Sequence, residues 1–250
     1  MERTIMKWGY KIGTSANIPV PVYLEISLYC HALITGSSGS GKSYALIFLI
    51  GALLQDDSTV DVYFCDFKNS EDFAFLEGYP HYYAGDDCYE GVMAYYDSFC
   101  AARKERKKGR RNVLIFDEYP AFINYLSGID KREKTKKAND VLSMIAEILM
   151  LGRGIGYGIW IVTQRADASL FANGARDNFM VILGLGRVSK EQKGMIFAGE
   201  EIPDRVFTRG EGMLLADGCE IKEIRIPRIR NMYDWKKQIR LLLIKNRNAE

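Results

Sequence analysis

The segment GSSGSGKS at residues 36–43 constrains the fold of this chain more than any other feature. It matches the pattern G-x-x-x-x-G-K-[ST] and lies between an apolar run, HALIT at 31–35, and a run with helical periodicity at 42–54. Glycines let successive backbone N–H groups point at phosphate oxygens, and the following helix adds its positive dipole end. The segment therefore predicts a phosphate-binding loop in an α/β fold. A flexible turn that matches the pattern by chance is the alternative, and the flanking strand and helix disfavour it.

The loop residues have distinct expected roles. Lys42 is expected to reach the β- and γ-phosphates of a nucleotide, and Ser43 to offer its hydroxyl to Mg²⁺. The predicted nucleotide-binding residues are Gly36, Ser37, Ser38, Gly39, Ser40, Gly41, Lys42, Ser43 and Tyr44.

Short apolar runs alternate with helix-period segments along most of the chain, and this pattern predicts a largely parallel sheet flanked by helices. The predicted strands are 31–35, 60–67, 112–117, 157–163 and 180–185, and the predicted helices are 42–54, 88–107, 136–151 and 189–198. A hairpin of 212–217 and 219–226 turning at Asp217-Gly218, and a closing helix at 233–247, are predicted to complete the chain. Because no repeat or linker is visible, we expect one domain over 1–250, with a lead-in (1–30), a core (31–200) and a terminal hairpin and helix (201–250).

Composition excludes several classes of function. The 34 basic and 32 acidic residues leave a net charge of +2, so contact with nucleic acid requires local clusters of charge. The 5 cysteines are scattered without a CxxC pair, which argues against disulfides and a zinc site. His31 and His81 lack metal-ligand spacing and are expected to be structural. The longest apolar run, ALIFLIGALL, is about half of the roughly 20 residues that span a bilayer, and no signal peptide is visible, so we expect a cytoplasmic protein with no transmembrane segment of its own.

A second glycine-rich segment, GRGIGYG at 152–158, raises the alternative of a dinucleotide site. A dinucleotide fingerprint lies between a strand and a following helix. This segment instead follows a predicted helix and precedes a predicted strand, so it is better interpreted as a helix stop and turn.

An acidic pair lies at the end of the predicted strand NVLIFD at 112–117. Asp117 and Glu118 lie at its carboxyl end, where α/β sheets bind their ligands. Asp117 is expected to help hold Mg²⁺, and Glu118 to polarise the water that attacks the γ-phosphate. An ordinary acidic turn is the alternative, but the phosphate loop upstream favours hydrolysis.

The next predicted strand ends in two polar residues, Thr163 and Gln164. If this strand lies beside the phosphate loop, both residues come near the γ-phosphate. Gln164 is then expected to sense whether the phosphate is intact and to relay its loss. The alternative is a polar strand exit with no such role.

Five segments in order resemble the FtsK/SpoIIIE/HerA family of hexameric motor ATPases over most of the chain. They are PVYLEISLYCHALITGSSGSGKS, DFKNSEDFAFLEGYPH with Asp66 and Lys68 in matching places, LIFDEYPAF, GRGIGYGIWIVTQR and TRGEGMLLAD. The resemblance implies a RecA-like P-loop core that binds ATP with Mg²⁺ between the subunits of a hexameric ring, around a path for double-stranded DNA.

The resemblance also implies an arginine that one subunit supplies to its neighbour's ATP. Arg103, on the helix after the second strand, is the first candidate, and Arg153, in the LGRGIG turn, is the second. An arginine opposite the γ-phosphate stabilises the transition state. A solvated surface charge is the alternative for both residues.

Two basic runs flank the acidic pair: RKERKKGRR at 103–111 and KREKTKK at 131–137, the latter expected in a loop that begins YPAFINYLSGID. Ring motors project loops at this place toward the pore, so the second run is expected to contact DNA phosphates. The predicted DNA contacts are Lys131, Arg132, Lys134, Lys136 and Lys137. A solvated face is the alternative for this run, and a subunit interface for part of the first.

The chain also departs from the family pattern. We expect no membrane segments, no long acidic or proline-rich linker and no winged-helix module, and Ala166 follows TQR where the family often has proline. The resemblance therefore favours a compact DNA-transfer ATPase of a mobile element, with membrane or relaxase partner proteins. A motor that moves protein substrates and a scaffold that binds ATP with little turnover are the alternatives.

Overall fold

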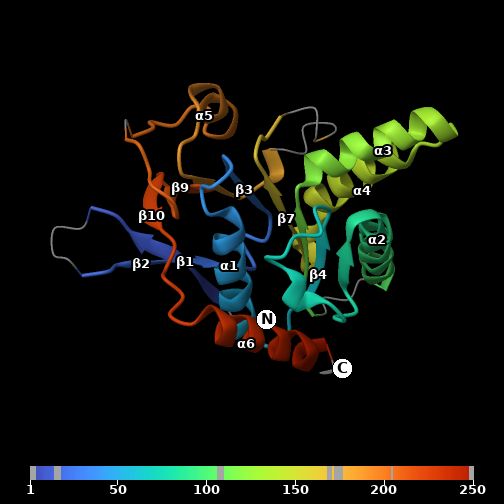
Figure 1. The fold of residues 1–250 in the computed structure, drawn as a ribbon, viewed down its shortest axis with the longest axis horizontal. Coiled ribbons are helices and arrows are strands. Elements are labelled where there is room, and N and C mark those ends of the chain that lie inside the picture. Colours follow the sequence, from blue (N-terminus) through green and yellow to red (C-terminus); the bar gives the residue numbers. More distant parts are fainter. Residues whose placement is uncertain are drawn as a thin grey trace.

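The computed structural model describes residues 4–13, 18–105, 110–167, 171, 177–203 and 205–247, and within these ranges ten strands form one sheet (Figure 1). The strand order is β2-β1-β10-β9-β8-β3-β7-β6-β4-β5. The strands from the two ends of the chain, β1, β2, β9 and β10, lie together next to the core strands, so the lead-in and the terminal hairpin belong to the same sheet as the core.

Six strands of the sheet are parallel, in the order β8-β3-β7-β6-β4-β5. They are β3 (Ala32–Gly36), β4 (Asp61–Asp66), β5 (Tyr82–Ala84), β6 (Asn112–Asp117), β7 (Tyr157–Thr163) and β8 (Val181–Leu185). Their carboxyl ends meet at one edge of the sheet, which is where α/β folds place their ligands.

The remaining four strands extend the sheet in antiparallel pairs, β8 with β9, β9 with β10, β10 with β1, and β1 with β2. They are β1 (Ile5–Lys11), β2 (Pro21–Glu25), β9 (Glu211–Ala216) and β10 (Lys222–Arg225). The predicted hairpin is therefore present, with residues 217–221 connecting its strands and Gly218 at φ 73°. Strands β1, β2 and β5 were not among the predicted strands.

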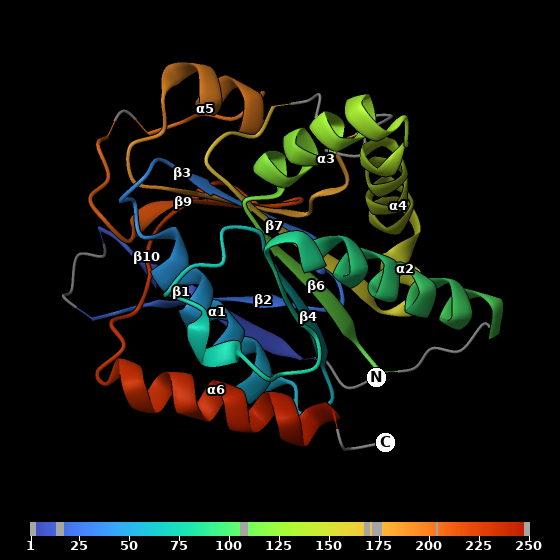
Figure 2. The ribbon, with the colours of Figure 1, turned by 45° about the vertical axis from the view of Figure 1, so that its right-hand side comes forward.

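Helices cover both faces of the sheet (Figures 1 and 2). Helices α1 (Lys42–Asp56) and α6 (Met232–Arg247) pack on one face, and α2 (Cys88–Glu105), α3 (Tyr119–Glu133) and α4 (Lys137–Leu151) pack on the other. The short helix α5 (Lys190–Ile196) lies beyond the carboxyl ends of the central strands. Three 3₁₀ turns, η1 (Ala74–Leu76), η2 (Gly85–Asp87) and η3 (Gly152–Ile155), complete the described elements.

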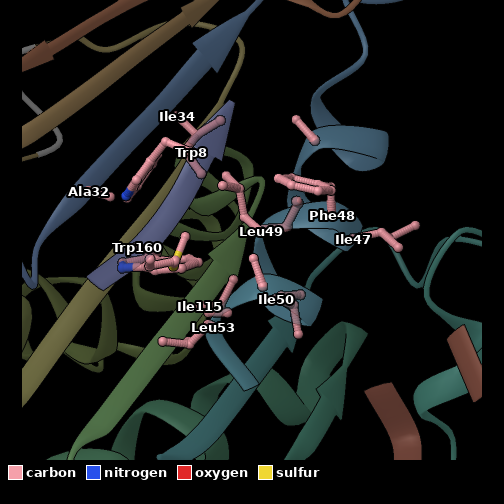
Figure 3. Close-up of a cluster of buried hydrophobic side chains, with 14 of the residues drawn as sticks. Trp8, Ala32, Ile34, Ile47, Phe48, Leu49, Ile50, Leu53, Ile115 and Trp160 are labelled. Atoms are coloured by element: carbon pink, nitrogen blue, oxygen red, sulfur yellow. The ribbon is translucent and has the colours of Figure 1, made fainter. Parts of the chain in front are cut away.

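Helix α1 is enclosed on all sides, and its residues 45–54 are all buried. One side packs on side chains of the sheet that include Trp8, Ile34, Ile115 and Trp160 (Figure 3). The other side packs on α6, where a Cβ at Gly51 would lie 2.4 Å from the indole of Trp235. A helix that is apolar all round is stable only in such a buried position.

The segment after the acidic pair corrects one prediction. Residues from Tyr119 form helix α3, not a loop, because Phe122, Ile123 and Leu126 recur at helical spacing and are buried. A proline in its first turn, Pro120, is compatible with a helix start. The basic run 131–137 consequently forms the tip of a helical hairpin between α3 and α4 (Figure 1).

The other predicted elements are confirmed, with end points that differ by no more than three residues where they are described. The end of the predicted helix 88–107 falls partly outside the described residues, since the structure describes α2 to Glu105. All five cysteines are free thiols. Among the described helices, none combines the length and the apolar character needed to cross a bilayer.

His31 is fully buried where β3 begins and has a structural role, as the sequence predicts. Its Nδ1 accepts a hydrogen bond of 3.1 Å from the backbone N–H of Ile159, and its Nε2 has no partner in the described part of the chain. Burial, helped by the charge of Arg153, lowers the pKa of His31 to about 3. The imidazole is therefore neutral in the folded protein.

This burial predicts a pH-dependent stability. An unfolded histidine has a pKa near 6.5, so between about pH 6.5 and 3 the unfolded chain binds a proton that the folded protein excludes. The free energy of unfolding should fall by about 1.4 kcal/mol per pH unit below 6.5, or about 2 kcal/mol at pH 5. His31→Asn keeps an acceptor for Ile159 without the titration, so urea unfolding should show a smaller loss between pH 7 and 5 in the variant. An equal loss in both proteins would contradict the assignment.

Candidate functional site

The phosphate loop connects β3 to α1 at the carboxyl edge of the sheet. Gly39 and Gly41 adopt left-handed φ values of 78° and 98°, which glycine tolerates without steric cost. Their backbone N–H groups have no acceptor among the described residues. The loop therefore presents unsatisfied donors at the start of a helix, the arrangement that binds phosphate.

The loop is fixed by close packing on its neighbours. A Cβ at Gly36 would lie 2.5 Å from the carbonyl oxygen of Leu185 and 2.6 Å from Ser40 Oγ. The Gly210 N–H donates a hydrogen bond of 2.9 Å to the carbonyl of Ser40. The end of β8 and the turn before β9 thus hold the loop in place.

A cavity of about 340 Å³ opens beside this loop. It brings together eight residues that the sequence predicts for the site: Ser38, Gly39, Gly41, Lys42, Ser43, Asp117, Glu118 and Gln164. It also contains four residues outside the predicted set of site residues: Lys68, Ser70, Asp72 and Arg209. The cavity therefore has both the cations and the carboxylates needed for a metal-bound polyphosphate.

Glu118 is the most constrained residue of the cavity. Its φ of 58° is left-handed, a conformation that costs a non-glycine residue about 1 kcal/mol or more and that clusters at functional sites. Its Oε1 accepts hydrogen bonds from Lys68 Nζ at 2.7 Å and from Gln164 Nε2 at 3.2 Å. The Glu118 side chain is only 10% exposed, so burial and these two hydrogen bonds fix the position of its carboxylate.

Asp117 lies beside Glu118 at the end of β6 and is buried. Burial, with the nearby charges of Glu118 and Asp66, raises the pKa of Asp117 to about 7. The positive charges of Lys68 and Lys42 oppose this rise. A divalent cation would favour the ionised form in the same way.

Lys42 folds back on its own loop. Its Nζ donates to the carbonyl oxygens of Gly36 at 2.7 Å and Ser37 at 3.2 Å, and burial lowers its pKa. The ammonium is thus held within the phosphate loop, where it is expected to contact the phosphates of a nucleotide. Ser43 and Asp117 offer the hydroxyl and carboxylate oxygens that Mg²⁺ prefers, so the residues present fit this ion.

The two polar residues at the end of β7, Thr163 and Gln164, lie in different environments. The register pairs Thr163 with Thr35 of β3, so the strand adjoins the phosphate loop as predicted. The Thr163 hydroxyl is turned to the backbone of Arg165, at 2.6 Å from its carbonyl oxygen. Gln164 alone of this pair lines the cavity, through its contact with Glu118.

Tyr44 and Asp66 support the site from outside it. The Tyr44 hydroxyl bonds to the backbone of Pro227 and Ile229, which ties the start of α1 to the segment before α6. Asp66 accepts hydrogen bonds from the Ser70 N–H at 2.8 Å and the Tyr82 hydroxyl at 3.2 Å. It thereby shapes the loop after β4 that carries Lys68 into the cavity.

Both predicted trans arginines lie away from the phosphate loop of their own chain. Arg103 is near the end of α2 and pairs with Glu147 of α4. Arg153, in η3, lines a separate cavity with Cys30 and Arg111, near the amino ends of the central strands. Neither arginine contacts this chain's own phosphate site.

The basic runs are placed differently from each other. Lys131, Arg132, Lys134 and Lys136 are exposed at the tip of the α3–α4 hairpin. The fifth predicted DNA contact, Lys137, is half-buried, with its Nζ 5.5 Å from the ring centroid of Tyr89. In the first run, residues 106–109 lie outside the described residues, whereas Arg110 bonds to the Thr59 carbonyl and Arg111 pairs with Asp57. The tip is thus the more accessible of the two runs.

A mostly parallel sheet, a phosphate loop after β3 and an acidic pair at the end of β6, with β7 between these strands, define a P-loop NTPase of RecA-like fold. Within that class, the chain belongs to the FtsK/SpoIIIE family, whose sequence profile matches residues 10–181.

Three known proteins are similar to this chain. The FtsK domain-containing protein YdcQ of Bacillus subtilis (strain 168) is 28% identical over 231 residues, which cover 86% of this chain and 46% of the relative. The chain therefore spans about half the length of that relative. The structure of the pCW3 conjugation coupling protein TcpA with ATPγS has a TM-score of 0.69 at 18% identity, covering 90% of this chain and 66% of TcpA. The cytoplasmic domain of the Type VII secretion ATPase EccC from Thermomonospora curvata has a TM-score of 0.67 at 19% identity, covering 96% and 31%.

The pKa of Asp117 predicts that magnesium–nucleotide binding depends on pH. Below about pH 7 this carboxyl is mostly protonated when no cation is bound, and it must lose its proton to bind Mg²⁺. The dissociation constant of a magnesium-bound, non-hydrolysable ATP analogue should therefore rise roughly tenfold from pH 8 to pH 6.

Asp117→Asn is the matched control, because it keeps the shape of the side chain and removes the titration. The nucleotide's own titration is common to both proteins, so isothermal calorimetry at pH 6, 7 and 8 isolates the contribution of Asp117. The same pH dependence in both proteins would show that this carboxyl does not bind the ion.

Proposed function

We propose that this protein is a magnesium-dependent ATPase that works as a hexameric ring in the cytoplasm and translocates double-stranded DNA, as in the transfer of a mobile element. The observation that carries the enzymatic part is the single cavity that contains Lys42, Ser43, Asp117, Glu118 and Gln164. Membership of the FtsK/SpoIIIE family supports the motor class.

The geometry around Glu118 supports hydrolysis. Lys68 and Gln164 fix one carboxylate oxygen, and the carboxylate lines the same cavity as the phosphate loop. A carboxylate in this position accepts a proton from the attacking water. The Gln164 amide faces the same carboxylate. Bound Mg²⁺ would be held by Ser43 and Asp117 and would neutralise charge on the phosphates.

Glu118→Gln should bind ATP about as tightly as the unmodified protein and lose at least about 100-fold in turnover, because general-base catalysis contributes about 10²–10⁴ in rate. Glutamine keeps the size of the side chain and the same strain at φ 58°, so folding should be preserved. Fluorescent-nucleotide binding and phosphate release measure the two properties. Undiminished turnover would refute the role of Glu118.

The ring and the trans arginine are part of the proposal. Arg103 and Arg153 lie far from their own phosphate site, so either acts on nucleotide only if a neighbouring subunit presents it. An arginine delivered in this way would couple hydrolysis to assembly. Arg103 already has Glu147 as an intramolecular partner, so its engagement would require that ion pair to break.

The exposed hairpin tip supports DNA as the substrate. Four cations on one projecting turn can engage phosphates without reading bases. The conjugation coupling protein TcpA is a structural neighbour and is consistent with a role in DNA transfer. Relaxase or membrane proteins would then be partners of the ring.

The tip predicts how DNA should affect turnover. Long duplex DNA should stimulate ATP hydrolysis, and the double variant Lys134→Ala/Lys136→Ala should require more DNA for the same stimulation. Log affinity falls with log salt, and each phosphate contact makes this slope steeper by about 0.9. The slope for DNA binding should therefore become less steep by about 2. The matched control is Lys237→Ala/Lys245→Ala, two exposed lysines of α6. If both double variants behave alike, the tip is not the DNA contact.

A motor that moves protein substrates is the second candidate, and the similarity to the secretion ATPase EccC favours it. The same assay separates the candidates, because turnover that is indifferent to duplex DNA at low and moderate salt points to a protein substrate. A protein that binds ATP without measurable turnover would instead be a nucleotide-gated scaffold.

A further inference from the structure

An arginine from the far end of the chain enters the phosphate cavity. Arg209 lies in the turn before β9, and it lines the same cavity as Lys42 and Glu118. Its Cγ lies 3.4 Å from the position that a Cβ would take on Gly41, the residue that precedes α1. The fold thus places a guanidinium next to the phosphate loop within one chain.

Arg209 differs from the other two cations of the cavity. Lys42 is bonded to loop carbonyls, and Lys68 is paired with Glu118. Arg209 is exposed and has no hydrogen bond or ion pair with any other described residue. Its donors are therefore available to a ligand without the loss of an existing contact.

The turn that carries Arg209 is held firmly. Glu211 is buried, accepts hydrogen bonds from Arg225 at 2.7 and 3.1 Å, and accepts one from the Thr208 N–H at 3.2 Å. Gly210 donates to Ser40 of the phosphate loop at 2.9 Å and accepts from Ile226 at 2.8 Å. A backbone fixed on both sides lowers the entropic cost of using its side chain in binding.

The sheet order fixes which part of a nucleotide Arg209 meets. Glu118 follows β6 and Gln164 follows β7, on one side of β3, whereas the Arg209 turn adjoins β8 and β9 on the other side. A triphosphate seated on the loop with its γ-phosphate at Glu118 extends its other phosphates toward β8. We infer that Arg209 is a nucleotide ligand supplied in cis, which binds the phosphates that remain after hydrolysis and leaves the γ-phosphate to the acidic side.

This inference rests on the proposed nucleotide site and predicts a particular pattern of affinities. Arg209→Ala should weaken ADP and ATPγS equally, because both nucleotides retain the phosphates that Arg209 contacts. The expected rise in both dissociation constants is roughly 10- to 100-fold, the usual value of a hydrogen bond to a charged group. Turnover at saturating ATP should stay within about twofold, since an interaction equal in ground and transition states changes KM and not kcat.

Two further variants make the test specific. Arg209→Lys keeps the charge and should recover part of the affinity, but not all of it, because an ammonium lacks the guanidinium fork. Arg230→Ala is the matched control: Arg230 is also exposed, but it lines a different cavity, between α1 and α6. Binding is measured with fluorescent ADP and by displacement with ATPγS.

The outcomes separate this inference from the proposed function. Unchanged affinity in Arg209→Ala, as in the control, overturns the inference while the ATPase proposal stands. A fall in kcat with ADP affinity intact also overturns it, and would assign Arg209 to the transition state. If the unmodified protein binds neither nucleotide, the proposed function fails together with the inference.

Discussion

The parallel alignment of β3, β7 and β6 is the constraint on which the site depends. Its register places Thr35 opposite Thr163, and Asp117 opposite Val162, so the three strands end together. The phosphate loop, the acidic pair and Gln164 each follow one of these ends directly. Sheet hydrogen bonds and buried side chains therefore set the positions of groups that are far apart in the sequence, and no flexible loop has to bring them together.

Glu118 and Lys42, two charged residues of the cavity, already have hydrogen-bond partners within the protein. Lys68 and Gln164 satisfy Glu118, and the loop carbonyls satisfy Lys42. Buried charges are stable only when they are paired in this way. A nucleotide bound in this cavity would therefore exchange these contacts for its own, since its phosphates would compete for Lys42.

Sequence predicted five of the six parallel strands, because each of these five is a short continuous apolar run and the phosphate loop fixes the place of the first, whereas β5 has only three half-buried residues. The prediction of a loop from Tyr119 was wrong because Pro120, Asn124, Ser127 and Gly128 resemble loop composition. Only the spacing of Phe122, Ile123 and Leu126 reveals the buried face of helix α3. The sequence did contain a signal for strands β1 and β2. Met6 and Trp8, and likewise Val22 and Leu24, are apolar residues two positions apart, and all four are buried. No signal in the sequence placed Arg209 at the site, because only the pairing of β9 with β8 brings this residue to the phosphate loop.

The same packing that builds the site also connects it to the end of the chain. Ser40 is bonded to Gly210, Tyr44 to the segment before α6, and Ile47 to Trp235 of α6. Packed interfaces of this kind move between discrete arrangements and do not deform continuously. A shift of the phosphate loop on nucleotide exchange would therefore displace the turn, the hairpin and α6 as connected elements. The α3–α4 hairpin starts from Glu118 itself, so a change at this carboxylate acts at the base of the helix that carries the basic tip. The elements on the two faces of the sheet are thus connected to different residues of one cavity.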